Sequence, residues 1–145
     1  MKALLQRVSR ACVEVEGTCV GRIERGLLVL LGLDRGDDRR SADRMLDKLL
    51  AYRVFADESG RMNDSVSDVG GGVLLVSQFT LSADTRKGLR PGFSFALPPA
   101  EAEDLYRYTL TRLQSRHPDV AAGVFGADMQ VTLTNDGPVT FLLEV

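Results

Sequence analysis

The stretch Leu27-Leu28-Val29-Leu30-Leu31-Gly32-Leu33 decides how the fold can be built, because it is the longest apolar run in the chain. A run of this length without polar alternation is typical of a strand that is buried on both faces. It is far shorter than the roughly 20 residues that a membrane-spanning helix requires. We therefore expect a central strand at this position, covered on both sides, and no membrane span.

Further strand patterns precede and follow this central strand. Alternating apolar and polar residues on either side of Gly17 predict an antiparallel hairpin made of residues 11–15 and 20–23. The same criteria predict strands that begin at Val54 and that cover residues 73–81, 129–133 and 139–145. The last two would form a hairpin-like unit across Asn135-Asp136-Gly137-Pro138, which is an ordinary turn by composition.

Two amphipathic helices complete the pattern. Apolar residues recur at helical spacing from Ala42 to Leu50, with Ser41 or an aspartate available to cap the start. A second helix is expected after Pro98-Pro99, where acidic residues occupy the first turn, and Pro118 would end it. We therefore expect an α/β fold: a mixed, mostly antiparallel two-sheet sandwich with both helices on one side, making three layers.

Length and composition fit one ordinary domain that spans residues 1–145. The chain has 145 residues, of which 44% are hydrophobic and 26% are charged. Its net charge of −2 argues against broad binding along a nucleic-acid duplex, but it is compatible with binding of one RNA end. The first residues, Met1 to Arg7, do not form a signal peptide, so a cytoplasmic location is expected.

The chain has too few histidines and cysteines for several common chemistries. His117 is the only histidine and ends the second helical pattern, and we expect Cys12 and Cys19 to be reduced structural thiols. Neither a zinc site nor a Ser-His-Asp arrangement can be assembled from these residues. The Gly70-Gly71-Gly72 run precedes a strand and lacks the Lys-Ser/Thr step of a phosphate-binding loop. We expect no metal and no organic cofactor.

Two segments carry polar residues where a strand would favour apolar ones. The first is Ser77-Gln78-Phe79-Thr80-Leu81, which follows a buried strand. Its pattern alone fits either a strand end with satisfied hydroxyls or the lining of an active site. The second is Asn135-Asp136-Gly137-Pro138-Val139-Thr140.

Read together, these segments resemble the D-aminoacyl-tRNA deacylase family, whose hallmarks are Ser-Gln-Phe-Thr and Asn-x-Gly-Pro-Val-Thr. Both motifs are unbroken here, at Ser77 to Thr80 and at Asn135 to Thr140. The resemblance spans nearly the whole chain, because it also includes Gln6-Arg7-Val8, Arg53-Val54-Phe55, Met62-Asn63-Asp64-Ser65, Gly88-Leu89-Arg90-Pro91-Gly92-Phe93 and Phe125-Gly126-Ala127-Asp128-Met129.

The resemblance implies a homodimeric hydrolase that cleaves the ester between a D-amino acid and the terminal adenosine of tRNA. Glycyl-tRNA mischarged on alanine tRNA is a further implied substrate. A cis Gly137-Pro138 peptide would project from one subunit into the site of the other, with Arg7 holding it in position. This main-chain wall would exclude L-amino acids, and a glycine permits the close approach.

By the same resemblance, Ser77, Gln78, Phe79 and Thr80 form the floor of the pocket, and Phe125 and Met129 lie near the adenosine. The Phe79 and Thr80 amides would bind the developing oxyanion. Thr80 has no evident activating partner in the sequence, so assistance by the 2′-hydroxyl of the tRNA is favoured over covalent attack by Thr80. Arg86, Lys87 and Arg90 would contact the acceptor end.

Two alternatives from other classes stay open at this point. One is an RNA-end-binding module without turnover. The other is a small-substrate esterase that uses Ser77, although Leu75 and Phe79 stand where a nucleophile elbow needs glycines.

Overall fold

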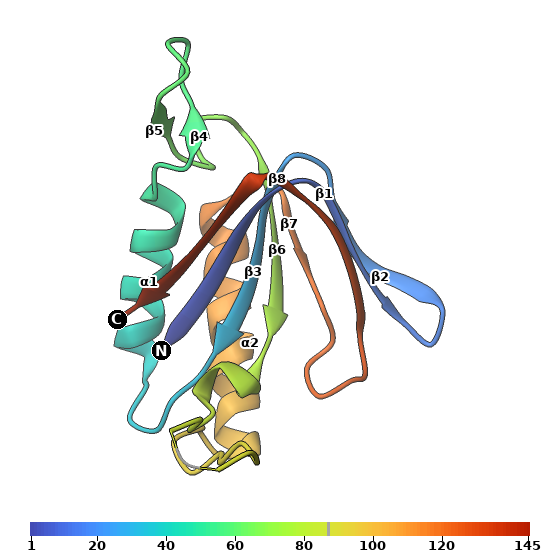
Figure 1. The fold of residues 1–145 in the computed structure, drawn as a ribbon, viewed down its shortest axis with the longest axis vertical. Coiled ribbons are helices and arrows are strands. Elements are labelled where there is room, and N and C mark those ends of the chain that lie inside the picture. The colour runs from blue at the N-terminus through green and yellow to red at the C-terminus, as the bar shows by residue number, and fades with distance from the viewer. Residues whose placement is uncertain (87) are drawn as a thin grey trace.

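The computed structural model describes residues 1–86 and 88–145 (Figure 1). Lys87, named above with Arg86 and Arg90, lies outside the described residues. The elements, in chain order, are the strands β1 (Lys2–Val15), β2 (Thr18–Ile23) and β3 (Gly26–Gly32), the helix α1 (Arg39–Ala51), the strands β4 (Phe55–Ala56), β5 (Met62–Asp64) and β6 (Gly72–Ser77), the 3₁₀ helix η1 (Phe79–Ser82), the helix α2 (Pro99–Arg116), and the strands β7 (Val120–Ala122) and β8 (Gln130–Glu144).

Six strands form one mixed sheet, with β1 and the expected central strand, β3, in its middle. The order is β2-β1-β3-β6-β7, and β8 also pairs with β1. β1 is antiparallel to β2, β3 and β8, whereas β6 is parallel to β3 and to β7. The prediction of a mixed, mostly antiparallel α/β fold is confirmed.

The sheet bends strongly instead of dividing into two separate sheets. β1 begins at Lys2 and not at Ala11; its first half pairs with β3 and its second half with β2. Beyond the bend β2 lies so close to β7 that a Cβ atom on Gly21 would stand 2.5 Å from the Ala122 oxygen. The result is nearly a barrel, so the expected sandwich of two sheets is not confirmed; the separate second sheet contains only β4 and β5.

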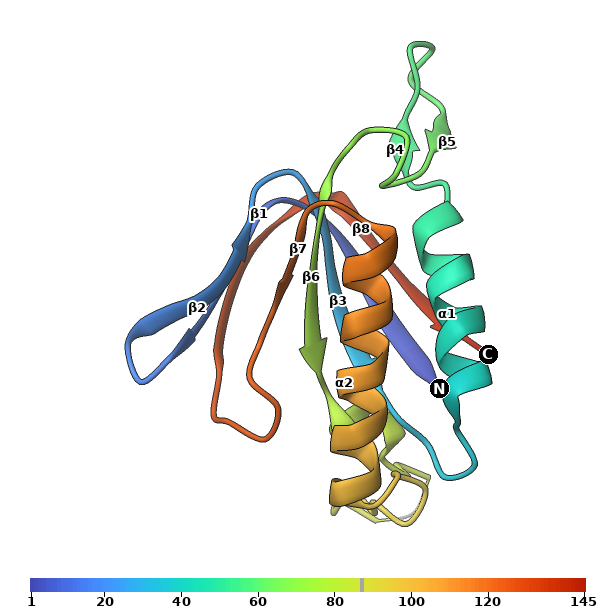
Figure 2. The same cartoon turned by 180° about the vertical axis from the view of Figure 1, so that it is seen from behind.

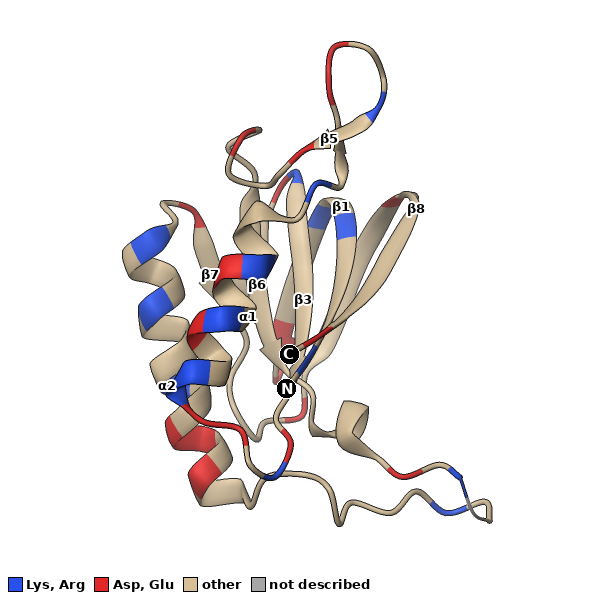
Figure 3. Cartoon of the chain, turned by 90° about the vertical axis from the view of Figure 1, so that its left-hand side faces the viewer, with Lys and Arg blue, Asp and Glu red and all other residues tan. Residues whose placement is uncertain are grey.

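Both helices cover one face of the sheet, as predicted (Figure 2). The Asp38 carboxylate accepts a hydrogen bond from the Ser41 amide at 2.9 Å, which caps the first turn of α1. Acidic residues lie at the start of α2 and basic residues towards its end, an arrangement that complements the helix dipole (Figure 3). The helices bury one side of β3 and β6, including Leu27, Val29, Val73 and Leu75.

A second apolar cluster fills the inside of the bend. It contains Val8, Ala11, Val13, Ile23, Leu28, Leu74 and Val76. β3 and β6 therefore have apolar neighbours on both faces, which explains why Leu27 to Leu33 shows no polar alternation.

The C-terminal hairpin predicted from composition is wrong, because β8 runs without reversal from Gln130 to Glu144. Both halves of β8 pair with β1, and the register shifts between them, near Val8. The Gly137-Pro138 segment is thus an irregularity within a strand and not a turn between two strands, and its peptide bond is cis.

The cysteine and histidine predictions can be compared with the side chains. Cys19 pairs with Glu14 in the hairpin register, and a bulge beside Glu14 leaves the sulfur atoms of Cys12 and Cys19 only 3.0 Å apart as free thiols. His117 follows α2 and is buried, with its Nε2 atom 2.7 Å from the Gly71 carbonyl oxygen. This contact makes His117 a structural residue.

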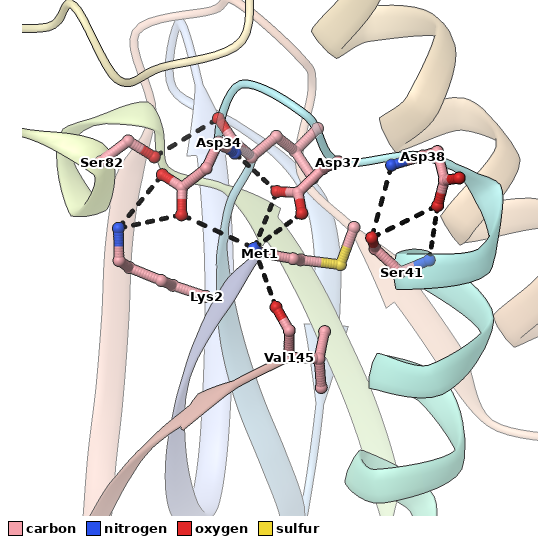
Figure 4. A network of polar contacts seen from close by, with 9 residues as sticks. Met1, Lys2, Asp34, Asp37, Asp38, Ser41, Ser82 and Val145 are labelled. Carbon is pink, nitrogen blue, oxygen red and sulfur yellow. Dashed lines mark hydrogen bonds and ion pairs between the residues drawn. The ribbon is translucent and has the colours of Figure 1, made fainter.

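A polar network ties the start of β1 to the segment between β3 and α1 (Figure 4). The α-amino group of Met1 lies 2.8 Å from the Asp37 carboxylate, and the Lys2 ammonium lies 2.9 Å from Asp34.

Among the described residues, the helices are too short or too polar to cross a membrane.

Candidate active site

The first polar segment lies where the parallel strands β3 and β6 end. The Gln78 amide donates a hydrogen bond to the Leu31 oxygen at 2.7 Å, and the chain then turns into η1. Gly32 permits this turn, since a Cβ atom there would lie 2.8 Å from the Leu81 Cβ atom. The strand predicted over 73–81 therefore ends at Ser77, and Ser77 to Thr80 stand at the edge of the sheet.

A cavity of about 670 Å³ opens beside this edge. Five residues singled out from the sequence line it: Ser77, Gln78, Phe79, Phe125 and Met129. Much of the remaining wall comes from the apolar segment between Phe93 and Ala102, which leads into α2, together with single residues of β3, β6 and β8. The volume is typical of a pocket for a small organic group, and the lining favours a flat aromatic one.

Aromatic residues frame the cavity. Phe79 is 59% exposed and packs on Phe93, with ring centres 4.9 Å apart. Phe125 packs on the buried Tyr106 at 5.6 Å. A nucleobase that entered the cavity would contact the edges and faces of these packed rings.

Thr80 is held by its neighbour Gln78. The Gln78 side-chain amide donates a hydrogen bond to the Thr80 hydroxyl oxygen at 2.6 Å. An amide that donates to this oxygen cannot remove the hydroxyl proton, so Gln78 does not act as a general base for Thr80. Among the described residues, the cavity lining contains no carboxylate and no histidine. The arrangement supplies hydrogen-bond donors but no protein base.

The second motif is held by Arg7. The Arg7 Nε atom donates to the Asp136 carbonyl oxygen at 3.0 Å, and Nη1 donates to the Val54 carbonyl oxygen at 2.6 Å. Gly137 has φ of +140°, a value that L-residues with side chains rarely adopt. Arg7, a candidate from the sequence, thus fixes the main chain beside Gly137 and Pro138.

Asn135 braces the same segment from within, a role that the sequence analysis did not assign. Its side-chain oxygen accepts from the Val139 amide at 2.8 Å, and its amide donates to the Thr140 hydroxyl at 2.8 Å. The available signal was the spacing of Asn135 and Val139, because asparagine often bonds nearby backbone groups.

Within one chain the two motifs lie apart (Figure 1). Arg7 pairs with Leu27, which pairs with Val73 near the start of β6, whereas Ser77 ends β6. Four residues of strand separate these levels, or about 13 Å. Arg7, Gly137 and Pro138 do not line the cavity. The structure therefore brings the candidate residues together as two groups at opposite ends of the sheet.

In the predicted basic cluster, the charge of Arg86 is compensated by a neighbouring carboxylate. Arg86 makes two hydrogen bonds to Asp84, at 2.8 and 2.9 Å. These bonds lower the pKa of Asp84 to about 2, so the pair is ionised and its charges cancel near neutral pH.

Arg35, which the sequence analysis passed over, is by contrast part of the cavity wall. It stands in an ordinary polar turn, and nothing in that pattern distinguished it.

Comparison with known proteins extends over the whole chain. A family model described as D-Tyr-tRNA(Tyr) deacylase matches residues 4–144. A D-aminoacyl-tRNA deacylase of Stutzerimonas stutzeri (strain A1501) is 65% identical over 144 residues, which are 99% of each chain. Another, of Cellvibrio japonicus (strain Ueda107), is 60% identical over 145 residues, covering 100% of this chain and 99% of its own.

Solved structures agree with this relationship. A structure titled "c-Myc DNA Unwinding Element Binding Protein" is 44% identical, with a TM-score of 0.96, and covers 100% of this chain and 99% of its own. A probable eukaryotic D-amino acid tRNA deacylase has a TM-score of 0.81 over 99% of this chain and 98% of its own; at 18% identity it shows the fold alone. With the family model and both bacterial relatives matching almost end to end, the chain belongs to the D-Tyr-tRNA(Tyr) deacylase family of enzymes.

Proposed function

We propose that this enzyme hydrolyses the ester that joins a D-amino acid to the terminal adenosine of tRNA, releasing free tRNA and the free amino acid. The observation that supports the proposal is the cavity, whose lining includes Ser77, Gln78, Phe79, Phe125 and Met129. The terminal adenosine occupies the apolar side near Phe125 and Met129. The ester then lies against η1.

Hydrolysis at this position relies on oriented donors. The first amides of a helix have no acceptor within the helix, so those of Phe79 and Thr80 are suited to bind the oxyanion that forms at the ester carbonyl. The 2′-hydroxyl of the adenosine helps to activate the attacking water. Covalent attack by Thr80 is disfavoured because Gln78, which contacts its hydroxyl, cannot remove the hydroxyl proton.

Chirality is enforced by main chain from a second copy of the protein. Gly137 and Pro138 lie a strand's length from their own cavity, so they serve the site of the partner in a homodimer. A backbone wall near the Cα atom of the substrate clashes with an L side chain but not with a D side chain or with glycine. A 10⁴-fold discrimination corresponds to about 5.5 kcal/mol.

The partners follow from this site. They are the acceptor end of a tRNA that carries a D-amino acid or glycine, including glycyl-tRNA mischarged on alanine tRNA, and a second copy of the chain. Binding is confined to the acceptor end, because the net charge of −2 does not favour a long duplex contact. We place the reaction in the cytoplasm, where tRNA is aminoacylated.

The test is deacylation of D-, L- and glycyl-tRNA side by side under identical conditions. The proposal requires rapid release from the D- and glycyl-esters and an L-ester that decays at the rate without enzyme. Binding without turnover would point to an RNA-end module. Equal cleavage of D- and L-esters would overturn the chiral wall.

A further inference from the structure

Arg35 is fixed to the rim of the cavity by main-chain bonds. The Leu97 amide donates to the Leu33 oxygen at 2.9 Å, and the Arg35 amide donates to the Phe95 oxygen at 2.7 Å. Asp34 forms an antiparallel bridge with Ala96 between these two bonds. The segment after β3 therefore runs along the segment before α2, and the position of Arg35 is set by the fold.

The charge of Arg35 is uncompensated within the described part of the chain. Its Nε atom donates to the Ser94 carbonyl oxygen at 2.7 Å, and no carboxylate described here lies within ion-pair distance of its guanidinium. The nearest acids in the sequence have other partners, as Asp34 binds Lys2 and Asp37 binds the Met1 amine (Figure 4). The two terminal nitrogens of Arg35 are thus available to a ligand.

Arg35 is also the only charged residue among those described as lining the cavity. A mostly apolar pocket with one guanidinium at its wall suits a ligand with a flat uncharged part and one attached anion. Guanidinium groups bind phosphate oxygens through paired hydrogen bonds.

We propose that Arg35 binds the phosphodiester that links the terminal adenosine to the preceding nucleotide of the tRNA. The inference rests on the proposed function, because it assumes that the adenosine occupies the cavity. The adenosine itself is uncharged, and its 5′-oxygen carries the first phosphate of the chain. Arg35 thereby distinguishes a tRNA end from an isolated aminoacyl-nucleoside.

The experiment compares substrates with and without this phosphate. Wild-type enzyme, Arg35→Ala and Arg35→Lys are assayed on three substrates. These are D-aminoacyl-tRNA, adenosine with the D-amino acid esterified to its ribose hydroxyl, and the same adenosine ester with a free 5′-phosphate. Arg44→Ala is the matched control, since Arg44 is exposed on α1 and no ion pair involves it among the described residues. Melting temperatures establish that each variant is folded.

For Arg35→Ala we expect KM to rise about tenfold on both phosphate-bearing substrates, with kcat unchanged. KM for the phosphate-free adenosine ester stays at the wild-type value. The slope of log KM against log salt for tRNA falls by about 1. Arg35→Lys recovers part of the loss, and Arg44→Ala behaves as wild type.

Two results would overturn the role of Arg35 while leaving the proposed function intact. One is an unchanged KM for tRNA in Arg35→Ala. The other is an equal loss on substrates with and without phosphate, which would mean that Arg35 only supports the Ser94 segment. Failure of the wild-type enzyme to cleave any D-ester would instead refute the proposed function itself.

Discussion

The Thr80 hydroxyl distinguishes two mechanisms, because each predicts a different effect of removing it. If the tRNA 2′-hydroxyl assists hydrolysis, Thr80→Ala loses only the hydrogen bond from Gln78, and the reaction rate should fall little. We expect Thr80→Ala to keep single-turnover activity within about tenfold of wild type. Wild-type enzyme should fail on a D-aminoacyl-tRNA that ends in 2′-deoxyadenosine.

The same two measurements identify the opposite mechanism. A covalent Thr80 would make Thr80→Ala almost inactive and would leave the deoxy substrate cleavable. Small and equal effects in both experiments would argue against either route.

Gly137 carries the second prediction at this scale. A Cβ atom there would lie 2.7 Å from the Val139 Cγ2 atom and 3.2 Å from the Arg7 Nη2 atom, at a φ of +140°. Gly137→Ala should therefore displace the segment and lower D-ester cleavage by at least about tenfold. Gly17→Ala is the control, because Gly17 has φ of +76° with open space around it. Similar activity losses in both variants would count against a special role for Gly137.

At the residue level, the sequence predicted part of a cavity lining, and the catalytic and binding roles of these residues stay predictions. Ser77, Gln78, Phe79, Phe125 and Met129 do line one cavity. The contact between Gln78 and Thr80 was not predictable, since it depends on the turn that η1 makes after β6. Side-chain directions in a short 3₁₀ helix do not follow from a strand pattern.

At the level of elements, periodicity predicted the helices well and the strand ends poorly. The apolar spacing of α1 and α2 follows from packing on a single face, which a sequence shows directly. The turn composition of Asn135 to Pro138 was misleading, because long-range pairing of β8 with β1 overrides it and Asn135 satisfies the exposed backbone. The first half of β1 lacked a clear alternation, since both of its faces are partly covered.

Tyr106 anchors α2 to the strand that leads into the site. Its hydroxyl donates to the Leu75 carbonyl oxygen at 2.9 Å in the interior. Tyr106→Phe should lower the free energy of unfolding by about 1 kcal/mol. Tyr108→Phe, which loses a bond to Asp43 near the surface, should change it less. Chemical denaturation measures both, and equal losses would contradict the importance of the buried contact.

The same residue predicts a pH dependence. Burial raises the pKa of Tyr106 above its ordinary value near 10. The unfolded state then loses this proton first, so stability is retained below about pH 10 and falls as the pH rises further. Tyr106→Phe should show a weaker decline between about pH 10 and 12 in the same denaturation assay. An identical decline would assign it to other groups.

At the scale of the whole molecule, the separation of the two motifs predicts complementation between subunits. In the proposed homodimer, Gly137→Ala would damage the wall, whereas Ala127→Trp would fill the cavity that Ala127 lines. After co-refolding of the two variants, each mixed dimer has one intact site. Statistical mixing should restore about a quarter of the wild-type activity.

Each variant refolded alone is the control for this experiment, and light scattering reports the dimer. A mixture as inactive as its components, or a fully active monomer, would mean that each site is built within one chain.

At the scale of the whole molecule, the bend of the sheet could not be predicted from the sequence. The alternating patterns indicated several of the strands, but they did not show that β1 changes partners from β3 to β2 along its length. The bend brings Gly21 close to Ala122, and a contact between residues so distant in sequence leaves no local pattern.

The contacts between Arg7 and the Gly137 segment also determine which neighbouring positions can change during evolution. Both strong bonds of its guanidinium end on carbonyl oxygens, those of Val54 and Asp136, which every amino acid provides. The carboxylate of Asp136 is 55% exposed and 3.6 Å from Nε, so it adds little. Positions 54 and 136 are therefore tolerant of replacement as far as this clamp is concerned. Arg7 is not, because a lysine cannot span two carbonyls at once.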